Sequence, residues 1–263
     1  CLAIVGSRNP TAQGGENARL FARALHSAGL AVVSGLALGV DAAAHEGALD
    51  AAMPDAPVAA TIAVVGTGLD RVYPRKNLDL AHRIAANGLL VSEYPLGTPP
   101  LPANFPKRNR IISGLSQGTL VVEAALASGS LITARMAAEQ GREVFAIPGS
   151  IHAPQSRGGH ALIRQGAKLV ESAQDVLEEL RMPSAPAVTS TSEAGDSEDL
   201  AAGSDEPEGP LLAALGFDPM SVDALVARTG MDAASVQVAL LELELEGRVA
   251  RLPGGLFQRM GSA

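Results

Sequence analysis

The sequence predicts an α/β fold, in which a Rossmann-like, doubly wound and mostly parallel sheet precedes a small C-terminal winged helix-turn-helix domain. Through the first 181 residues, short apolar segments alternate with longer amphipathic segments. The apolar segments lack polar alternation, which is typical of strands buried on both faces of a parallel sheet. A second apolar pattern begins near residue 210, after a stretch without any sustained apolar period.

Seven strands are expected in the first part of the chain, with amphipathic helices between them. The strands are expected at residues 2–5, 30–34, 61–65, 89–92, 119–122, 143–147 and 168–170. The helices are expected at residues 16–28, 41–51, 78–87 and 133–140. This alternation of strand and helix predicts a parallel sheet covered by helices on both faces.

The composition divides the chain into domains 1–181 and 210–263, joined by residues 182–209. The joining segment is rich in Pro, Ser, Ala and acidic residues, so we expect a disordered acidic linker. In residues 210–263, helices are expected at 220–226 and 233–246, with Ser221 and Asp232 as caps. A hairpin wing is expected at 249–252 and 256–258.

Composition excludes several classes of protein. The chain of 263 residues has one cysteine, Cys1, which excludes a disulfide framework and a four-cysteine zinc site. It contains no apolar run long enough for a membrane span and no signal-peptide pattern, so we expect a soluble, cytoplasmic protein without membrane association. It begins directly in a predicted strand, as a fragment without its natural N-terminus would.

The net charge of −8 is unevenly distributed along the chain. Residues 182–209 contain seven acidic residues and no Lys or Arg, whereas residues 1–181 have a net charge of +1. Because the local potential governs binding of phosphate groups, the first domain can still carry a cationic patch.

The stretch 105–133 points to the ligand class. Lys107, Arg108, Asn109 and Arg110 precede a predicted strand, and a turn at Ser128 and Ser130 follows it. Arginine offers planar, bidentate donors to phosphate oxygens, and the start of a helix adds N–H donors and a favourable dipole. We therefore expect a protein that holds a nucleotide or a nucleic-acid backbone.

Glycine-rich loops follow the predicted strands and should meet at one rim of the sheet. They include Gly6-Ser7-Arg8-Asn9 and Ser34-Gly35-Leu36-Ala37-Leu38-Gly39. Any one of these loops taken alone is more typical of an ordinary turn. Asp41 and His45 are likewise more typical of a helix cap and a packed or loop-tethering residue than of a catalytic pair.

Two side-chain roles stay open from the sequence. Glu123 could act as a general base or order the cluster of Arg108 and Arg110. Tyr73, Tyr94 and Phe105 are expected in loops, where they either stack on bases or pack against neighbouring prolines. No catalytic motif of the kinds GxSxG, GxxxxGK[ST] or HExxH is present, so we expect neither an enzyme nor a cofactor.

The motifs of the first domain resemble those of the DNA-processing protein A (DprA/Smf) family. They are AIVGSR at 3–8, SGLALGVDAAAH at 34–45, GTGLDRVYP at 66–74, FPKRNRIISGLS at 105–116, EAALASGSLITA at 123–134, IPGS at 147–150 and GAKLV at 166–170. Residues 223–255 resemble the winged-helix tail of many members. The small helical domain that many members carry before the Rossmann-like part has no counterpart here.

The resemblance implies a function and a site. It implies a protein without catalytic activity that binds single-stranded DNA in natural transformation, protects the incoming strand and promotes loading of the RecA recombinase. It also implies a homodimer formed through the Rossmann-like domain, for which we expect a surface around Leu162, Ile163, Val170, Val176 and Leu177. The alternative is that these residues pack the last strand and helix onto the core, which is the role we expect for Val170. The DNA-binding residues expected are Gly6, Ser7, Arg8, Gly35, Lys76, Phe105, Lys107, Arg108, Asn109, Ser128, Ser130 and Thr133.

Two other functions remain as alternatives. Gly118-Thr119 followed by Glu123 echoes Rossmann-like hydrolases that cleave nucleoside monophosphates. A winged-helix transcription factor is the weaker alternative, because its recognition helix at 233–246 would bring three glutamates to the phosphates. We expect the second domain to contact protein instead.

Overall fold

A computed structural model describes residues 1–53, 58–181, 210–215, 219–252 and 254–260. The chain divides into two compact units, Cys1–Ser184 and Ala185–Ala263. Each unit is described by itself. The segment 182–209, expected to be a disordered linker, lies outside the described residues, and the proposed domain boundaries stay a prediction.

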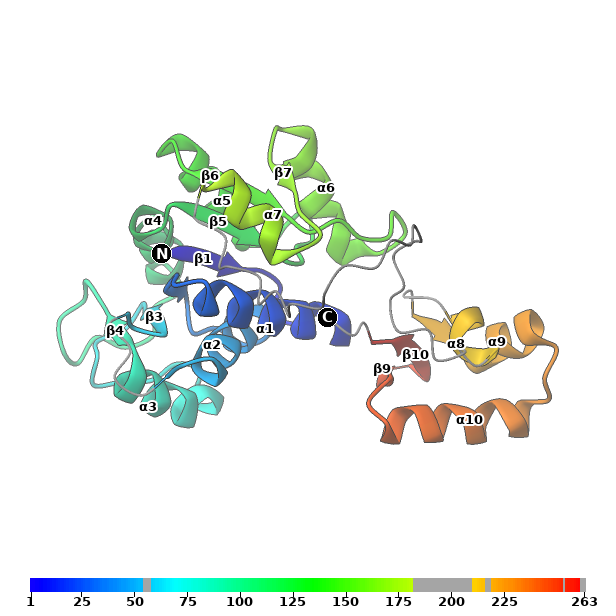
Figure 1. The fold of residues 1–263 in the computed structure, drawn as a ribbon. Helices are drawn as coiled ribbons and strands as arrows, with labels where there is room; N and C mark the ends of the chain where they lie inside the picture. Colours follow the sequence, from blue (N-terminus) through cyan, green and yellow to red (C-terminus); the bar gives the residue numbers. More distant parts are fainter. Residues whose placement is uncertain (54–57, 182–209, 216–218, 253, 261–263) are drawn as a thin grey trace, which may run out of the picture. The chain divides into compact units, whose positions relative to one another are not determined.

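The first unit is built on a seven-stranded parallel sheet of order β4-β3-β2-β1-β5-β6-β7 (Figure 1). Its strands are β1 (Leu2–Val5), β2 (Val32–Ser34), β3 (Thr61–Val64), β4 (Leu89–Val91), β5 (Gly118–Val121), β6 (Glu143–Ala146) and β7 (Lys168–Leu169). All seven were expected from the apolar segments. The strand order reverses direction between β1 and β5, where Ile4 pairs with Leu120. Ligands of such sheets bind outside the carboxyl ends of the strands at that reversal.

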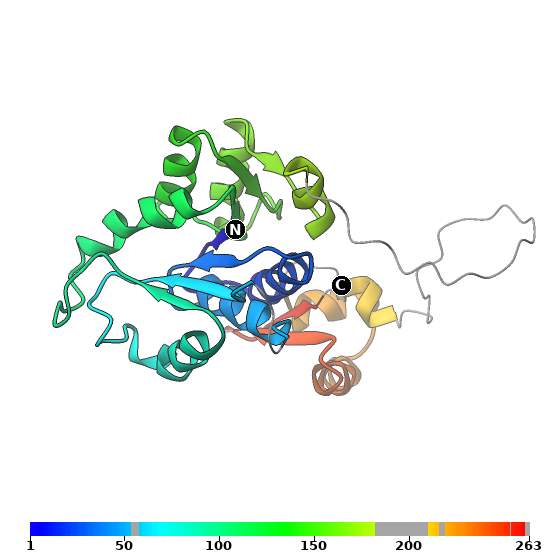
Figure 2. The same ribbon diagram turned by 60° about the vertical axis from the view of Figure 1, so that its left-hand side comes forward.

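Helices cover both faces of this sheet, as the turned view shows (Figure 2). They are α1 (Ala12–Ser27), α2 (Val40–Asp50), α3 (Leu78–Asn87), α4 (Asn104–Leu115), α5 (Ser130–Glu139), α6 (Arg157–Arg164) and α7 (Ala173–Glu179), with short 3-10 helices η1 (Arg75–Asn77) and η2 (Pro154–Ser156). Alternate residues of β1 enter different cores. Leu2 and Ile4 pack with residues of α1 and α2, whereas Ala3 and Val5 pack with Ile112 of α4. The doubly wound α/β prediction is confirmed.

Two expectations about the first unit were wrong. Residues 104–115, including Phe105, form helix α4 rather than a loop. Four of the five residues expected at the dimer surface lie in the interior, because Leu162, Val170, Val176 and Leu177 are all at most 9% exposed, whereas Ile163 is half-buried. These apolar residues hold α6, β7 and α7 onto the rest of the domain.

The second unit has the expected winged-helix elements. They are α9 (Val222–Thr229), α10 (Ala233–Leu245), β9 (Val249–Leu252) and β10 (Leu256–Arg259). Two further elements, α8 (Pro210–Leu215) and β8 (Met220–Ser221), were not expected, and the sheet order is β8-β10-β9. Ser221 accepts from Ala224 N and Asp232 accepts from Ser235 N, so both expected caps are confirmed. In the part of the chain that the structure describes, no helix is long and apolar enough to cross a membrane.

Candidate functional site

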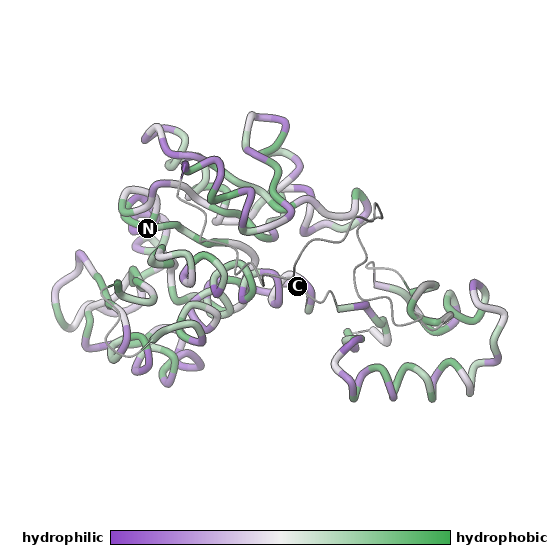
Figure 3. Tube along the Cα trace, viewed as in Figure 1, coloured by the Kyte–Doolittle hydropathy of each residue, from purple (hydrophilic) through white to green (hydrophobic). Residues whose placement is uncertain are grey.

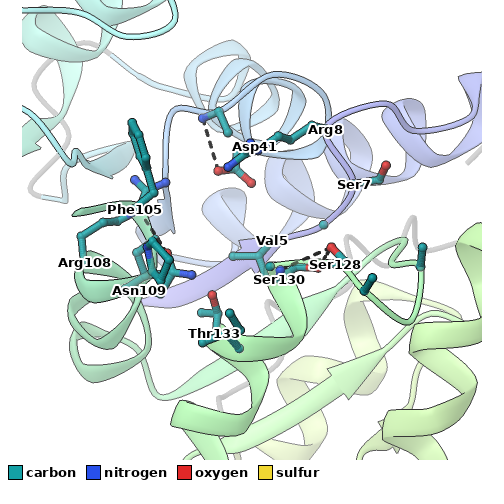
Figure 4. A pocket seen from close by; sticks show the side chains of 18 of the residues that line it. Val5, Ser7, Arg8, Asp41, Phe105, Arg108, Asn109, Ser128, Ser130 and Thr133 are labelled. Carbon is teal, nitrogen blue, oxygen red and sulfur yellow. Dashed lines mark hydrogen bonds between the residues drawn. The ribbon is translucent and has the colours of Figure 1, made fainter. Parts of the chain in front are cut away.

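A cleft of about 700 Å³ opens at the carboxyl ends of β1 and β5, at the reversal of strand order (Figure 4). One wall is the loop after β1, residues 5–9, and a second is the inner face of α4. The third is the segment 125–133 that enters α5. The fold therefore places segments from opposite halves of the sheet around one hollow.

Most of the expected site residues line this cleft. Those that do are Gly6, Ser7, Arg8, Phe105, Arg108, Asn109, Ser128, Ser130 and Thr133. Three lie outside it. Gly35 is behind the wall, Lys76 is exposed on η1, and Lys107 lines a separate hollow of about 410 Å³ beside Tyr94 and Arg110. The apolar part of the lining, for example Ile112 and Ile132, was not expected from the sequence.

The loop 34–39 is fixed to the cleft by its backbone amides and carbonyls. Gly35 N and Ala37 N donate to the Asp41 carboxylate over 3.1 and 3.3 Å. Asn77 Nδ2 donates to the carbonyl oxygens of Leu36 and Ala37 over 3.0 and 3.1 Å. The cap of α2 is Gly39, so the expectation that Asp41 caps this helix was wrong. Asp41 instead holds the loop that precedes the helix.

His45 of α2 tethers the same loop through its side chain, as expected. Leu36 has a positive φ of 58°, and its N–H donates to His45 Nε2 over 3.3 Å. Thr61 Oγ1 donates to Val32 O over 2.7 Å, so it accepts from His45 Nδ1–H over 2.7 Å. Burial, and then the charge of Arg108, lower the pKa of His45 from 6.5 to about 3. The imidazole is therefore neutral and acts as a fixed hydrogen-bond bridge.

Arg108 is a buried cation at the back of the cleft. Its side chain is 5% exposed, and Nη1 donates to Gly35 O over 2.6 Å and also to Val64 O. Nε donates to Asn109 Oδ1 over 3.1 Å. Burial lowers the pKa of Arg108, and the charge of Arg8 lowers it further, while the Asp41 carboxylate opposes both. Arg108 thus supplies positive potential to the cleft, while most of its N–H donors bind other groups of the protein.

Arg8 differs from Arg108 because its side chain is exposed. It follows β1 in a loop fixed by the bond from Val40 N to Ser7 O, 3.0 Å long. Gly6 allows this close packing, since a Cβ there would lie 2.8 Å from a methyl group of Val40. The loop therefore presents a free guanidinium at the mouth of the cleft.

The segment entering α5 forms the opposite wall. Ser128 Oγ and Ser130 Oγ lie 2.6 Å apart and share a hydrogen bond, and Ser130 N donates to Ser128 Oγ over 3.3 Å. The first turn of α5 carries no acidic residue. Leu131 N and Ile132 N donate to Ser128 O and Gly129 O over 3.2 and 3.1 Å, so these N–H groups are already paired. The turn therefore offers an anion in the cleft the positive end of the helix dipole and the hydroxyl groups of Ser128 and Ser130.

Glu123 serves neither of the roles that the sequence left open. Its carboxylate accepts from Thr11 N over 2.9 Å and from Thr11 Oγ1 over 2.6 Å, and Thr11 in turn caps α1. It does not line the cleft. It also does not order the arginines, because Arg110 pairs with Glu93 and Arg108 lies close to Asp41. Glu123 therefore stabilises the start of α1.

Two aromatic residues, Tyr73 and Phe105 of α4, form a pair in the lining of the cleft. The ring centroids of Tyr73 and Phe105 are 5.5 Å apart at an interplanar angle of 37°, and both residues line the cleft. Tyr73 is 50% exposed. Tyr94 is not part of this lining, and its Oη donates to Asn104 O over 3.4 Å. Among the described residues, no cluster of His, Cys, Asp and Glu could hold a metal ion.

Comparison with known families places both units. Residues 1–181 match the family model for DNA recombination-mediator protein A, and residues 195–255 match the DprA winged helix domain. The chain is 47% identical to protein Smf of Escherichia coli over 260 residues. The aligned region covers 97% of this chain and 66% of that protein. It is 47% identical over 179 residues to DNA processing protein DprA of Bacillus subtilis, covering 68% of this chain and 58% of the relative.

Solved structures agree with these matches. The crystal structure of DNA processing protein A from Streptococcus pneumoniae superposes with a TM-score of 0.62 at 50% identity, covering 68% of this chain and 60% of that one. A structure of DNA processing protein A from Helicobacter pylori, described by its single-stranded DNA binding mode, gives 0.61 at 34% identity, covering 68% and 79%. The chain belongs to the DNA recombination-mediator protein A family.

Proposed function

We propose that the first domain binds single-stranded DNA in the cleft between β1 and α5. The observation that carries the proposal is the combination of an exposed arginine, a helix N-terminus and an aromatic pair, with Tyr73 exposed and Phe105 half-buried, around one hollow. Phosphates need the first two and bases need the third. The Helicobacter pylori relative, 34% identical, is described as binding single-stranded DNA, which supports the same ligand here.

We assign the cationic and the aromatic groups of the cleft to different parts of the DNA strand. Arg8 and the first turn of α5 lie on opposite walls, and we assign them to phosphate oxygens. Tyr73 and Phe105 also line the cleft and offer ring faces to one or two bases. A base inside a duplex presents no free face, so this arrangement favours single strands. Sequence specificity is not expected, because every base has a stackable face.

Lys76 and Lys107 are proposed to contribute to DNA binding from outside the cleft. Both are exposed, and both lie outside the cleft on elements that border it, η1 and α4. We propose that they attract the backbone where the strand enters and leaves. Each such contact releases counterions, so binding should weaken steeply with added salt.

In the cell, we propose that the protein acts in natural transformation and recombination, in the cytoplasm and without membrane association. There it protects incoming single strands and promotes loading of RecA. The relatives named DNA processing protein DprA in Bacillus subtilis and Streptococcus pneumoniae support a DNA-processing role. The chain spans 58–66% of the length of the Escherichia coli, Bacillus subtilis and Streptococcus pneumoniae relatives, so roles lodged in the rest of those proteins are not carried over.

We also propose that the first domain forms a homodimer, through a surface beside β7 that shares Ile163 with the one expected from the sequence. β7 is an edge strand, and a hollow of about 550 Å³ beside it is lined by Leu126, Pro148, Ile163 and Leu169 among others. Leu126 and Leu169 are 62% and 50% exposed. Two cleft-bearing domains on one strand would gain avidity through effective concentration.

Light scattering tests the dimer. The chain should scatter as a dimer at about 10–100 micromolar, and Leu169→Glu should convert it to a monomer. A wild-type monomer in that range would limit association to weaker than about 7 kcal/mol and would refute the proposal.

Catalysis is not part of the proposed function. The alternative, a nucleoside monophosphate hydrolase, needs Glu123 as a catalytic carboxylate, and this carboxylate is bonded to Thr11 outside the cleft. We expect no free base to be released from nucleoside monophosphates. Release that disappears in Glu123→Gln would favour the hydrolase instead.

Titration with labelled oligothymidylate and a matched duplex, repeated across salt, tests the main proposal. We expect tighter binding of the single strand and a linear fall of log K with log salt concentration. Equal or tighter binding of the duplex would refute the proposed ligand.

A further inference from the structure

Helix α10 of the winged-helix unit carries an apolar stripe on its exposed side. Val238, Leu241 and Leu245 are 59%, 56% and 81% exposed. Their spacing of three and four residues places them on one face of the helix. The opposite face supplies Val236 and Leu240, which are at most 1% exposed and belong to the core of the unit. The helix is therefore apolar on two sides, and the core of the unit covers one of them. Figure 3 shows hydrophobic and hydrophilic residues alternating along this helix.

Carboxylates border the stripe on both edges. With a rotation of 100° per residue, Glu242 follows Leu241 on one edge and Glu244 precedes Leu245 on the other. Within the described part of the unit, the ion pair of this segment joins Glu246 to Arg248 and leaves Glu242 and Glu244 out. The helix itself contains no Lys or Arg. Its exposed face thus presents an apolar strip between two negative edges.

From this pattern we propose that α10 is the docking surface for a protein partner that presents an apolar helix face flanked by lysine or arginine. A complementary helix would bury the three apolar side chains and place its cations beside Glu242 and Glu244. Amphipathic helices bind in this manner through anchors at i, i+3 and i+7. Opposite charges at the edges then set orientation and the rate of encounter.

The same charges disfavour two other occupants. A nucleic-acid backbone would meet the glutamates with like charge, so α10 is a poor recognition helix. In an antiparallel pair of two α10 helices, the glutamate edges would again face glutamates, and like-charge contacts lower affinity. The cationic partner has no such conflict. This inference concerns the second unit and does not depend on DNA binding by the first.

The inference can be tested with two synthetic amphipathic peptides that share a leucine stripe but carry either lysine or glutamate at the flanking positions. Binding to the full chain is followed by fluorescence anisotropy. We expect the lysine peptide to bind at least about tenfold more tightly than the glutamate peptide, which corresponds to about 1.4 kcal/mol. Equal binding of both peptides would overturn the charge argument.

Two variants separate docking on α10 from attraction to the acidic residues elsewhere in the chain. Leu241→Ser with Leu245→Ser keeps every charge and should weaken lysine-peptide binding about tenfold, because the apolar contact is lost. Glu242→Lys with Glu244→Lys should reverse the preference toward the glutamate peptide. Unchanged peptide binding in both variants would place the contact elsewhere and refute the inference. The inference would also be refuted if the wild-type chain bound duplex DNA, or a second copy of itself, through α10 more tightly than it binds the lysine peptide.

Circular dichroism of each variant checks that the unit remains folded. Since all four substituted side chains are exposed or half-buried, neither pair of substitutions removes a core contact.

Discussion

The Arg108 guanidinium lies against the backbone of Gly35, donating from Nη1 to the Gly35 carbonyl oxygen over 2.6 Å. A Cβ on residue 35 would overlap the guanidinium. The two residues are far apart in the sequence, one after β2 and the other on α4. Their contact joins the loop 34–39, which contributes Ala37 to the cleft lining, to the helix that carries Phe105 and Asn109, and so fixes the α4 wall to the loop behind it.

Gly35→Ala should disturb this contact. The added methyl group must displace Arg108 or the loop, which we expect to cost about 1–3 kcal/mol of unfolding free energy and to weaken binding of oligothymidylate. Urea denaturation and anisotropy measure the two effects. Gly15→Ala is the matched control, because a Cβ there meets only Pro10 Cγ at 4.0 Å within helix α1. An equally small effect of both substitutions would contradict the proposed role of Gly35.

His45 should make stability depend on pH. Its pKa is about 3 in the folded protein and about 6.5 when unfolded, so between these values only the unfolded chain takes up the proton. The free energy of unfolding should therefore fall as pH is lowered below about 6.5, by up to about 1.4 kcal/mol per pH unit. Urea denaturation at several pH values should show a shallower dependence in His45→Gln. The Asp41 carboxyl is present in both proteins, so its contribution cancels in the difference.

Tyr73 offers a direct optical test of base stacking. The chain has no Trp and two Tyr, so in Tyr94→Phe all tyrosine fluorescence comes from Tyr73. We expect oligothymidylate to quench that emission, and an abasic strand of the same length to quench it much less. Tyr73→Leu should weaken binding by about 1–3 kcal/mol per stacked base, whereas Tyr73→Phe should retain it. Binding without any quenching would remove Tyr73 from the site but leave the DNA ligand in place.

Lys107 should act through charge alone. Lys107→Gln should reduce the slope of log K against log salt concentration by about one unit, and so weaken binding mainly at low salt. Arg142→Gln removes a cation at the opposite, amino end of β6 and should leave the slope unchanged. A slope that stays the same in Lys107→Gln would exclude a phosphate contact by this residue.

The strands could be predicted because their side chains are buried on both faces, so each one is a continuous apolar segment. Helix α4 was missed, since Pro106 and the polar run 107–110 have no clear apolar period. Pro106 is tolerated in the first turn, where its missing N–H has no intrahelical role. The burial of Arg108 could not be inferred either. It depends on carbonyl groups of Gly35 and Val64, which only the tertiary fold brings to it.

Most of the expected site residues line the cleft, but the partners of several motif residues were not predicted. For Glu123 the sequence left open a general base and a partner of arginines, and the structure shows its carboxylate bonded to Thr11 at the N-terminus of α1. Local sequence places a carboxylate at the end of β5, but it does not say which neighbouring loop reaches it. Similarly, Leu162 and Val176 form an apolar pattern that fits a surface or a core equally well, and burial decides for the core.

The most direct test of the central claim is the affinity of Arg8→Ala for oligothymidylate, compared with that of Arg23→Ala. Both substitutions remove one exposed arginine, but Arg23 lies on α1 away from the cleft lining. We expect Arg8→Ala to weaken binding about tenfold or more, as the loss of a charge-assisted contact to phosphate does, with the thermal midpoint nearly unchanged. Arg23→Ala should bind almost as the wild-type chain does. Equal affinities of the two variants would contradict the assignment of the cleft as the DNA site.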